Sequence, residues 1–389
     1  MHSDERLVRG HSGRLLLVVS LGWLAIQGGR LLLSPLVPEI TTDLGVSSFL
    51  VGIAFTTMWG IYAFLQYPSG RLSDALSRKT LLLTGLVCCV VGFAALGVAP
   101  TYPLFLVGSA VVGLGAGCYP TAARALVSDH FVEKREKAFG LHTGSGDVGG
   151  VAAAGVAAAA LALATWRTAF VPVVVLLAVV TVAYHRLSRE AFVVERSDLA
   201  VVATARRLLA DPLMRGLLVV YVLYAFTWQS TAAFLPTYLE LGKGFDPLVA
   251  KVAFALLFAV GAVAKPGAGY VASRLPRKWL IPSALVLGAL SLAGVVLASS
   301  PLPALVAVGC FAVGLMAYPP MMQSFLMDTF PDDSAGGDLG AMRSVYIGLG
   351  ALGPTYVGAV ASTATYALAF TGLVGCLLVS ATLLVYLAD

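Results

Sequence analysis

Charged side chains are scarce in this sequence. Asp, Glu, Lys and Arg make up 12% of the 389 residues, whereas hydrophobic residues make up 59%. Soluble globular proteins carry about 25% charged residues, so this chain could not cover a soluble surface. The scarcity also excludes a disordered chain and a basic nucleic-acid-binding domain. We therefore expect a polytopic membrane protein, with the lipid bilayer around it and no nucleic acid as a partner.

Disulfide frameworks and common catalytic motifs are also missing. All five cysteines stand inside long apolar runs, which is typical of small hydrophobic residues. The sequence has no CxxC pair, no Walker motif, and neither HExxH nor GxSxG. The pattern GxGxxG occurs over 144–149 and 348–353, but both strings lie in apolar segments where glycine serves close helix packing. We expect no cofactor, no metal site and no enzymatic activity.

Long apolar runs fill nearly the whole chain. A helix needs about 20 apolar residues to cross a bilayer. We predict an all-α membrane protein with twelve transmembrane helices, over 14–35, 48–69, 79–98, 104–127, 139–162, 168–186, 214–238, 249–270, 279–299, 302–326, 340–361 and 366–387. The polar gap at 187–213 is expected to be a cytoplasmic linker between two six-helix bundles, 1–186 and 214–389.

Basic residues are distributed unevenly between the two sides of the membrane. Of the 25 Lys and Arg, 18 fall in the N-terminal tail or in loops on its side, three fall in the opposite loops, and four lie inside expected helices. Cytoplasmic loops are enriched in Lys and Arg, so both termini are expected in the cytoplasm. The first apolar run is too long for a signal peptide and contains Arg30, which favours a retained helix in a cell (inner or plasma) membrane.

Two segments half a chain apart are similar to each other. Residues 70–79 read GRLSDALSRK, and residues 269–278 read GYVASRLPRK, at an offset of 199. At the same offset, Tyr119-Pro120 recurs as Tyr318-Pro319. Parallel repeats of six helices are one known transporter design.

The first of these segments resembles the cytoplasmic loop motif of the major facilitator superfamily, Gly-x3-Asp-x2-Gly-Arg-Lys/Arg. It departs from the motif at Ser77, where the family usually has Gly, and the second copy has Ser273 in place of Asp. The twelve helices, the linker and the repeat fit the same family, so the resemblance covers essentially the whole chain. It implies a monomeric secondary transporter whose two bundles give alternating access to a central site.

The resemblance also implies a cytoplasmic gate. Gly70 would allow a close helix approach, and Asp74 would accept hydrogen bonds at the start of the eleventh helix, where the dipole favours an anion. Arg78 would pair with Asp129. The full set of expected gate residues is Gly70, Asp74, Arg78, Lys79, Asp129, Gly269, Arg277, Lys278 and Asp328. The alternative is that the basic residues of the loop only determine topology.

Polar residues form a stripe on the first helix. Trp23, Gln27 and Arg30 follow one another at spacings of four and three, which places them on one face. The helix over 214–238 has a stripe of its own, Tyr221, Tyr224, Trp228 and Thr231. In the resembling family these two helices line the central cavity. A guanidinium beside aromatic rings suits an oxyanion ligand, whereas the alternative is a structural Arg bonded to carbonyl groups.

Other polar residues within the spans are weaker candidates. Asp147 stands in the glycine-rich helix over 139–162, where a carboxyl that exchanges protons could couple transport to a proton gradient. A structural pair with Arg124 on the preceding helix is the alternative. Tyr119 and Tyr318 could contact substrate, although each precedes a proline that favours a helix kink.

Together these patterns predict a secondary active transporter of a small anion, organic or inorganic, moved with protons or by exchange. The alternative is proton-driven efflux of amphipathic drugs. Two antiporter features of the resembling family are missing, because Ser109 stands where drug antiporters usually carry Arg and the fifth helix has no Gly-Pro pair. A membrane receptor or scaffold would not explain the buried cation and the repeated loop together.

Overall fold

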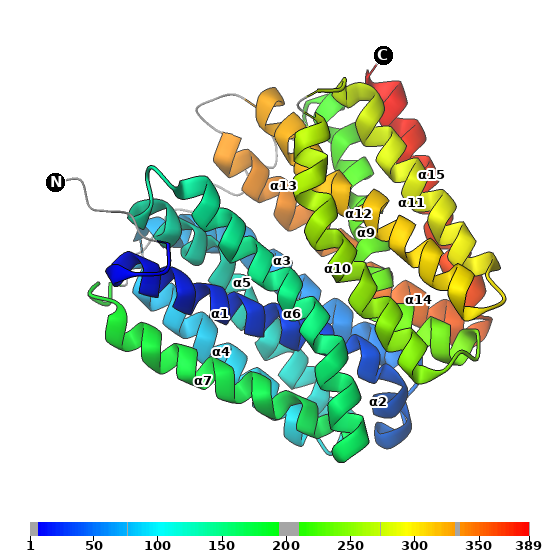
Figure 1. Ribbon diagram of the computed structural model, residues 1–389, viewed down its shortest axis with the longest axis horizontal. Helices are drawn as coiled ribbons and strands as arrows, with labels where there is room; N and C mark the ends of the chain where they lie inside the picture. The colour runs from blue at the N-terminus through cyan, green and yellow to red at the C-terminus, as the bar shows by residue number, and fades with distance from the viewer. Residues whose placement is uncertain (1–6, 76, 194–209, 273, 331–334, 389) are drawn as a thin grey trace. The chain divides into compact units, whose positions relative to one another are not determined.

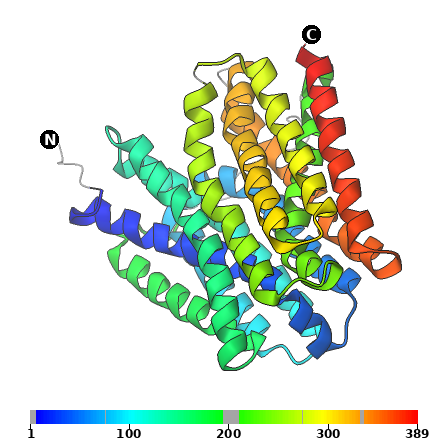
Figure 2. The same ribbon diagram turned by 45° about the vertical axis from the view of Figure 1, so that its right-hand side comes forward.

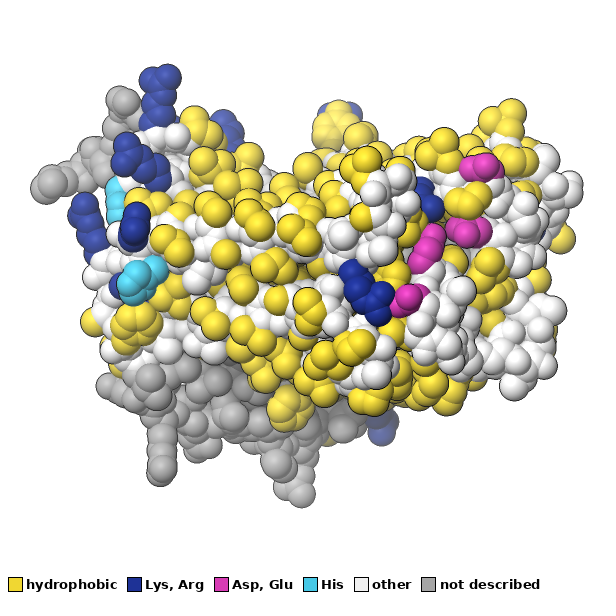
Figure 3. Space-filling model, turned by 90° about the horizontal axis from the view of Figure 1, so that it is seen from below, with side chains coloured by type: hydrophobic (Ala, Val, Ile, Leu, Met, Phe, Trp, Pro, Cys, Tyr) yellow, Lys and Arg dark blue, Asp and Glu magenta, His cyan; other side chains and the backbone are white. Residues whose placement is uncertain are grey.

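The computed structural model describes residues 7–75, 77–193, 210–272, 274–330 and 335–388, apart from the side chains of 67–75, 335–337 and 388. This part of the chain consists of helices and contains no strand. Twelve of its helical segments are long and apolar enough to cross a membrane, which confirms the predicted number of spans. In Figure 3, hydrophobic side chains are spread over the described part of the face and charged ones are few, as expected of a surface that meets lipid.

The helices group into two compact units (Figures 1 and 2). Unit 1 is residues 1–32 and 61–199, and unit 2 is residues 33–60 and 200–389. The elements in the first half of the chain are α1 (Gly10–Leu32), η1 (Ser34–Leu36), α2 (Val37–Leu44), α3 (Ser48–Ala75), α4 (Arg78–Val98), α5 (Tyr102–His130), α6 (Arg135–Leu163), η2 (Trp166–Ala169) and α7 (Phe170–Leu187). Those in the second half are α9 (Pro212–Thr237), the π-helical turn η3 (Tyr238–Gly242), α10 (Pro247–Ala272), α11 (Arg277–Leu297), α12 (Pro301–Thr329), α13 (Ala335–Gly350), α14 (Leu352–Thr363) and α15 (Tyr366–Ala388).

Both units repeat one pattern of helix neighbours. In unit 1, α4 packs against α5 and α7, and α1 packs against α6 and α7. In unit 2, α11 packs against α12 and α15, while α9 packs against α13, α14 and α15. The recurring pattern agrees with the repeat seen in the sequence.

Glycine allows the closest of these helix contacts. Gly85 of α4 and Gly115 of α5 face each other, and a Cβ atom on Gly115 would lie 2.6 Å from the Gly85 carbonyl oxygen. Gly314 of α12 has the same relation to Gly288 of α11, with 2.6 Å between its Cβ position and the Gly288 nitrogen. Small residues let helix backbones approach within a bilayer, so these glycines fix the packing of each unit.

The glycine-rich string of the fifth span also serves packing. A Cβ atom on Gly146 would lie 2.6 Å from the Trp23 Nε1 atom, and one on Gly28 would lie 3.0 Å from the Gly149 carbonyl oxygen. Both positions lie where α6 crosses α1. The string is therefore an interhelical contact within a membrane span and not a phosphate-binding loop.

The first span is interrupted, which the sequence analysis did not predict. α1 ends at Leu32, a short 3-10 turn follows, and α2 continues from Val37. Pro35 and Pro38 lie at the starts of the two later elements, where a missing N–H does no harm, but neither could continue α1 without losing a backbone hydrogen bond.

Residues 33–60 pack with the helices of the second half of the chain, in unit 2. The Ser34 hydroxyl donates to the Ala233 carbonyl at 2.9 Å, and the Thr56 hydroxyl donates to the Ala351 carbonyl at 2.5 Å. A Cβ atom on Gly52 would lie 2.5 Å from the Pro354 carbonyl oxygen. The contacts therefore group residues 33–60 with the second half of the chain, whereas the sequence repeats divide the chain at 187–213. The division into two six-helix bundles stays a prediction.

Candidate functional site

Among the described residues of unit 1, Arg30 is the most deeply buried cation. Its side chain is 1% exposed, and it lies near the end of α1. Its Nη1 atom donates to the Gln27 Oε1 atom at 2.8 Å, and its guanidinium carbon lies 4.2 Å from the centroid of the Tyr62 ring. Both of these contacts are with uncharged side chains. Tyr62 comes from α3 and had no signal in the sequence that would have grouped it with Arg30.

Trp23 stands on the same helix and lies between two aromatic rings. Its ring is parallel to that of Tyr119 at a centroid distance of 6.5 Å, and it stacks on the His142 ring at 6.1 Å. Tyr119 is fully buried, and its hydroxyl donates to the Val19 carbonyl at 2.8 Å. Tyr119, which was predicted as a substrate contact, thus forms a hydrogen bond that links α5 to α1.

His142 is a polar residue that sequence reasoning missed. It belongs to α6, is 3% exposed, and its Nδ1 atom has no hydrogen-bond partner among the described residues. Asp147 lies further along α6 and is also buried, at 8% exposure. Arg124 of α5 donates through its Nε atom to the Pro120 carbonyl at 3.1 Å and lies within electrostatic range of His142. The structure therefore places three ionisable groups on α5 and α6, and the predicted role of Asp147 in proton coupling stays a prediction.

In unit 2, four tyrosines form a buried cluster. Tyr221 stacks on Tyr346 at 4.0 Å between ring centroids, and Tyr224 stacks on Tyr318 at 4.4 Å. The Tyr224 hydroxyl donates to the Leu315 carbonyl at 3.0 Å, whereas the Tyr318 hydroxyl is buried without a hydrogen-bond partner among the described residues. Three of the four were expected from sequence. Tyr346 was not, because nothing in its local pattern links it to α9.

Trp228 lies apart from this cluster. Its ring packs edge-on against Phe258 of α10 at 5.8 Å, although Trp228 shares a helix face with Tyr221 and Tyr224 in the sequence pattern. The neighbouring Gln229 is 1% exposed and donates through Nε2 to the Ile347 carbonyl at 3.0 Å. The expected aromatic stripe of α9 is thus divided: Tyr221 and Tyr224 pack in the tyrosine cluster, whereas Trp228 packs against α10.

Each unit contains one of the ion pairs expected at the gate. In unit 1 the Arg78 Nε atom lies 2.8 Å from an Asp129 carboxylate oxygen. In unit 2 Arg277 pairs with Asp328. In both pairs the aspartate follows the arginine by 51 residues. These pairs link the start of α4 to the end of α5, and the start of α11 to the end of α12. Their role in gating stays a prediction.

The remaining gate residues have less support. The side chains of Gly70 and Asp74 lie outside the described residues. Lys79 is 9% exposed and donates through Nζ to the Ser188 carbonyl at 3.2 Å. Lys278 is exposed with its Nζ 5.5 Å from the Trp279 ring, and a Cβ atom on Gly269 would meet no described atom within 4 Å.

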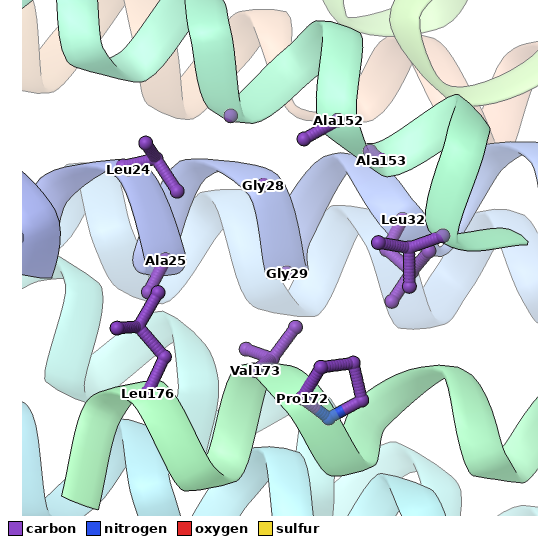
Figure 4. Close-up of a pocket in the computed structure, with 12 residues that line it drawn as sticks. Leu24, Ala25, Gly28, Gly29, Leu32, Ala152, Ala153, Pro172, Val173 and Leu176 are labelled. Atoms are coloured by element: carbon purple, nitrogen blue, oxygen red, sulfur yellow. The ribbon is translucent and has the colours of Figure 1, made fainter. Parts of the chain in front are cut away.

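A small cavity of about 100 Å³ lies among α1, α6 and α7 (Figure 4). Residues from all three helices line it, including Gly28, Ala153 and Val173, and none of its lining residues is charged. Gly29 lines it too, but the next residue, Arg30, does not. An oxyanion would find no hydrogen-bond donor there, so this cavity does not serve as the predicted anion site.

The described residues form twelve helices long and apolar enough to cross a membrane, a repeated helix pattern and buried polar faces, which together define a polytopic membrane protein of the transporter type. The family model described as "Major Facilitator Superfamily" matches residues 19–354. The chain belongs to this superfamily. It is therefore a multi-pass cell-membrane protein and a transporter, not an enzyme.

Individual relatives add detail over part of the chain. The chain is 31% identical over 98 residues to "Multidrug resistance protein MdtL" of Escherichia coli O139:H28 and to the protein of that name from Shigella boydii. These matches span 25% of this chain and 25% of each relative. A solved bacterial homologue of the human lysosomal transporter Spinster, inward-facing and unoccupied, has a TM-score of 0.77 at 17% identity, over 98% of this chain and 96% of that one. This last similarity establishes the fold alone.

Proposed function

We propose that this transporter moves a small organic or inorganic anion by alternating access, with both chain termini in the cytoplasm. The observation that supports the anion is Arg30, a buried cation beside Tyr62 and Gln27. An ionised side chain within a membrane protein is costly and usually marks a functional position. A guanidinium can hold a carboxylate or another oxyanion through two parallel charge-assisted hydrogen bonds.

Trp23 and Gln27 are proposed as further substrate contacts on α1, because they share the face of Arg30. In unit 2, the cluster of Tyr221, Tyr224 and Tyr318 is proposed to supply aromatic contacts. The unpartnered hydroxyl of Tyr318 supports this assignment, since a buried phenol without a partner loses a hydrogen bond that a ligand could restore.

Proton coupling is proposed at Asp147, with Arg124 of α5 as the second candidate residue; a structural pair between the two is the alternative. The burial of Asp147 supports this, because an acid in a membrane span is rare outside ion and proton pathways. Asp147→Asn should abolish substrate accumulation driven by a pH gradient in proteoliposomes while leaving substrate exchange intact. If Asp147→Asn accumulates substrate as wild type does, Asp147 is structural.

The test of the anion is a thermal-shift comparison of purified wild type and Arg30→Gln with carboxylates, phosphate, nitrate, sugars and lipophilic cations. A ligand at about 100 times its dissociation constant stabilises a protein by about 2.7 kcal/mol. We expect an anion to stabilise wild type but not Arg30→Gln. Lys251→Gln is the matched control, since it removes a buried cation of unit 2 and should keep the response.

Efflux of amphipathic compounds is the second candidate. Two observations favour it: the similarity to MdtL over 98 residues and the buried tyrosine cluster, whose ring faces attract organic cations. In the same experiment, lipophilic cations would then stabilise wild type and Arg30→Gln equally, and no anion would stabilise either.

A further inference from the structure

Helices α4 and α7 of unit 1, which pack side by side, leave a groove between them. Its volume is about 660 Å³, within the range of roughly 300–1,000 Å³ typical of ligand sites. Leu83 and Val87 of α4 and Val182 of α7 form apolar walls, and Val87 and Val182 are 49% and 52% exposed. An apolar chain lying along this groove would bury surface that the helices themselves leave uncovered.

The groove has a basic end. His185 and Arg186 stand in the last turn of α7, line the groove and are exposed. Within the described part of the chain, Arg186 makes no ion pair or hydrogen bond through its side chain. Glu190, four residues further on, accepts a hydrogen bond from the Lys79 backbone N–H at 3.1 Å. This end of the groove is therefore suited to an anion.

The chain beyond α7 turns back over the basic end and brings an aromatic ring to it. Lys79 holds the segment by donating to the Ser188 carbonyl. The Phe192 ring then lies 5.1 Å from the Lys79 Nζ atom and 6.3 Å from the His185 ring. Phe192 lines the groove and is 58% exposed. A basic rim beside an exposed aromatic ring is typical of the boundary between hydrocarbon and headgroups.

The groove lies within one leaflet. An α-helix rises about 1.5 Å per residue, so Leu83 and Cys88 lie roughly 7 and 15 Å along α4 from its first residue, Arg78. The hydrocarbon core is about 30 Å thick, so the lining residues of α4 all fall within one half of it. In the orientation proposed above, that half is the cytoplasmic leaflet, whose surface is negative because it contains anionic lipids.

We infer that this groove binds one anionic phospholipid of the cytoplasmic leaflet. The lipid phosphate lies at His185 and Arg186, and one acyl chain runs along Leu83, Val87 and Val182. Arg186 offers two parallel N–H donors, and His185 donates an N–H whether its ring is neutral or charged. The lipid is a bound component of unit 1 and not the transported substrate. The site rests on the proposed function only through the orientation of the termini.

Native mass spectrometry of the delipidated full chain tests the site, with phosphatidylglycerol and phosphatidylcholine of identical acyl chains as probes. Wild type should retain phosphatidylglycerol preferentially. Arg186→Gln should reduce that preference about fivefold, because one basic residue near a lipid surface contributes about 1 kcal/mol and 1.4 kcal/mol is a factor of ten. Arg186→Lys should keep most of it. Thr84→Trp, which fills the groove from an exposed position on α4, should weaken both lipids.

Arg215→Gln is the matched control, because it removes an exposed cation at the start of α9 in unit 2. The proposal is overturned if Arg215→Gln lowers the preference as much as Arg186→Gln does, if Arg186→Gln with His185→Gln keeps the full preference, or if glycerol phosphate alone competes as well as the lipid. Anion transport plays no part in these measurements, so a failed substrate assignment leaves them interpretable.

Discussion

The guanidinium of Arg30 lies over the face of the Tyr62 ring, with 4.2 Å between the guanidinium carbon and the ring centroid. α1 supplies the cation and α3 supplies the ring, and both side chains are buried within unit 1. A desolvated cation–π contact contributes about 2 kcal/mol. Tyr62 therefore stabilises a charge that the apolar surroundings disfavour, and it fixes the direction in which the guanidinium points.

Replacing Tyr62 should reveal that role. Tyr62→Leu should lower the free energy of unfolding by about 2 kcal/mol, since it removes the ring face from a buried cation. Tyr62→Phe keeps the ring face and loses only the hydroxyl, which hydrogen-bonds Arg30, so it should cost less, about 1 kcal/mol. Thermal unfolding in detergent measures both. Equal losses in the two variants would mean that the phenol hydroxyl, and not the ring face, stabilises Arg30.

The crossing of α1 and α6 should tolerate no added methyl group at Gly149. A Cβ atom there would overlap the Leu24 carbonyl oxygen and lie 2.9 Å from the Gly28 nitrogen, and backbone atoms can give way only if the helices move apart. Gly149→Ala should cost about 1–3 kcal/mol. Gly144→Ala, on the same helix with open space at its Cβ position, should be neutral or slightly stabilising. Similar unfolding temperatures for the two variants would contradict this account of the packing.

Two buried phenols of unit 2 should respond differently to loss of the hydroxyl. Tyr224→Phe removes the hydrogen bond to the Leu315 carbonyl and should cost about 1 kcal/mol. Tyr318→Phe removes a hydroxyl that has no partner among the described residues and should be neutral or stabilising. If Tyr318 contacts substrate, its Phe variant keeps the stability of the free protein but loses part of the ligand-induced shift. A large stability loss in Tyr318→Phe would show that its hydroxyl has a structural partner.

The Arg78–Asp129 pair should contribute little to stability. Its side chains are 30% and 45% exposed, and ion pairs at exposed positions contribute about 0–1 kcal/mol. In a double-mutant cycle with Arg78→Gln and Asp129→Asn, we expect a coupling energy below about 1 kcal/mol. If the pair has a role in gating, variants that break it should lose transport. The charge exchange Arg78→Asp with Asp129→Arg should then partly restore transport. A coupling energy well above 1 kcal/mol would make the pair a structural element.

Much of the fold could be predicted from the sequence because each span is a long apolar run. The predicted ends were less accurate, since polar residues extend several helices beyond those runs: α5 begins at Tyr102 and ends at His130, where 104–127 was expected. The break at Leu33–Leu36 was also missed, although Pro35 and Pro38 mark it.

The candidate site could be predicted only in part. Arg30 and Gln27 were found because helical spacing places them on one face, and the hydrogen bond between them follows from that spacing. Tyr62, His142 and Tyr346 were missed, because each belongs to the site through a contact with another helix. A single sequence gives the face of a helix, but it does not give the neighbour against which that face packs.

Helix α3 belongs to unit 2 up to Gly60 and to unit 1 from Ile61 onward. A cut in the chain between Val193 and Ala210 would therefore not yield one unit per fragment. The N-terminal fragment would still contain residues 33–60, and the C-terminal fragment would lack the segment that covers parts of α9 and α14. The two fragments should recover a native fold only when they are produced together, with the N-terminal fragment donating the missing piece to its complement.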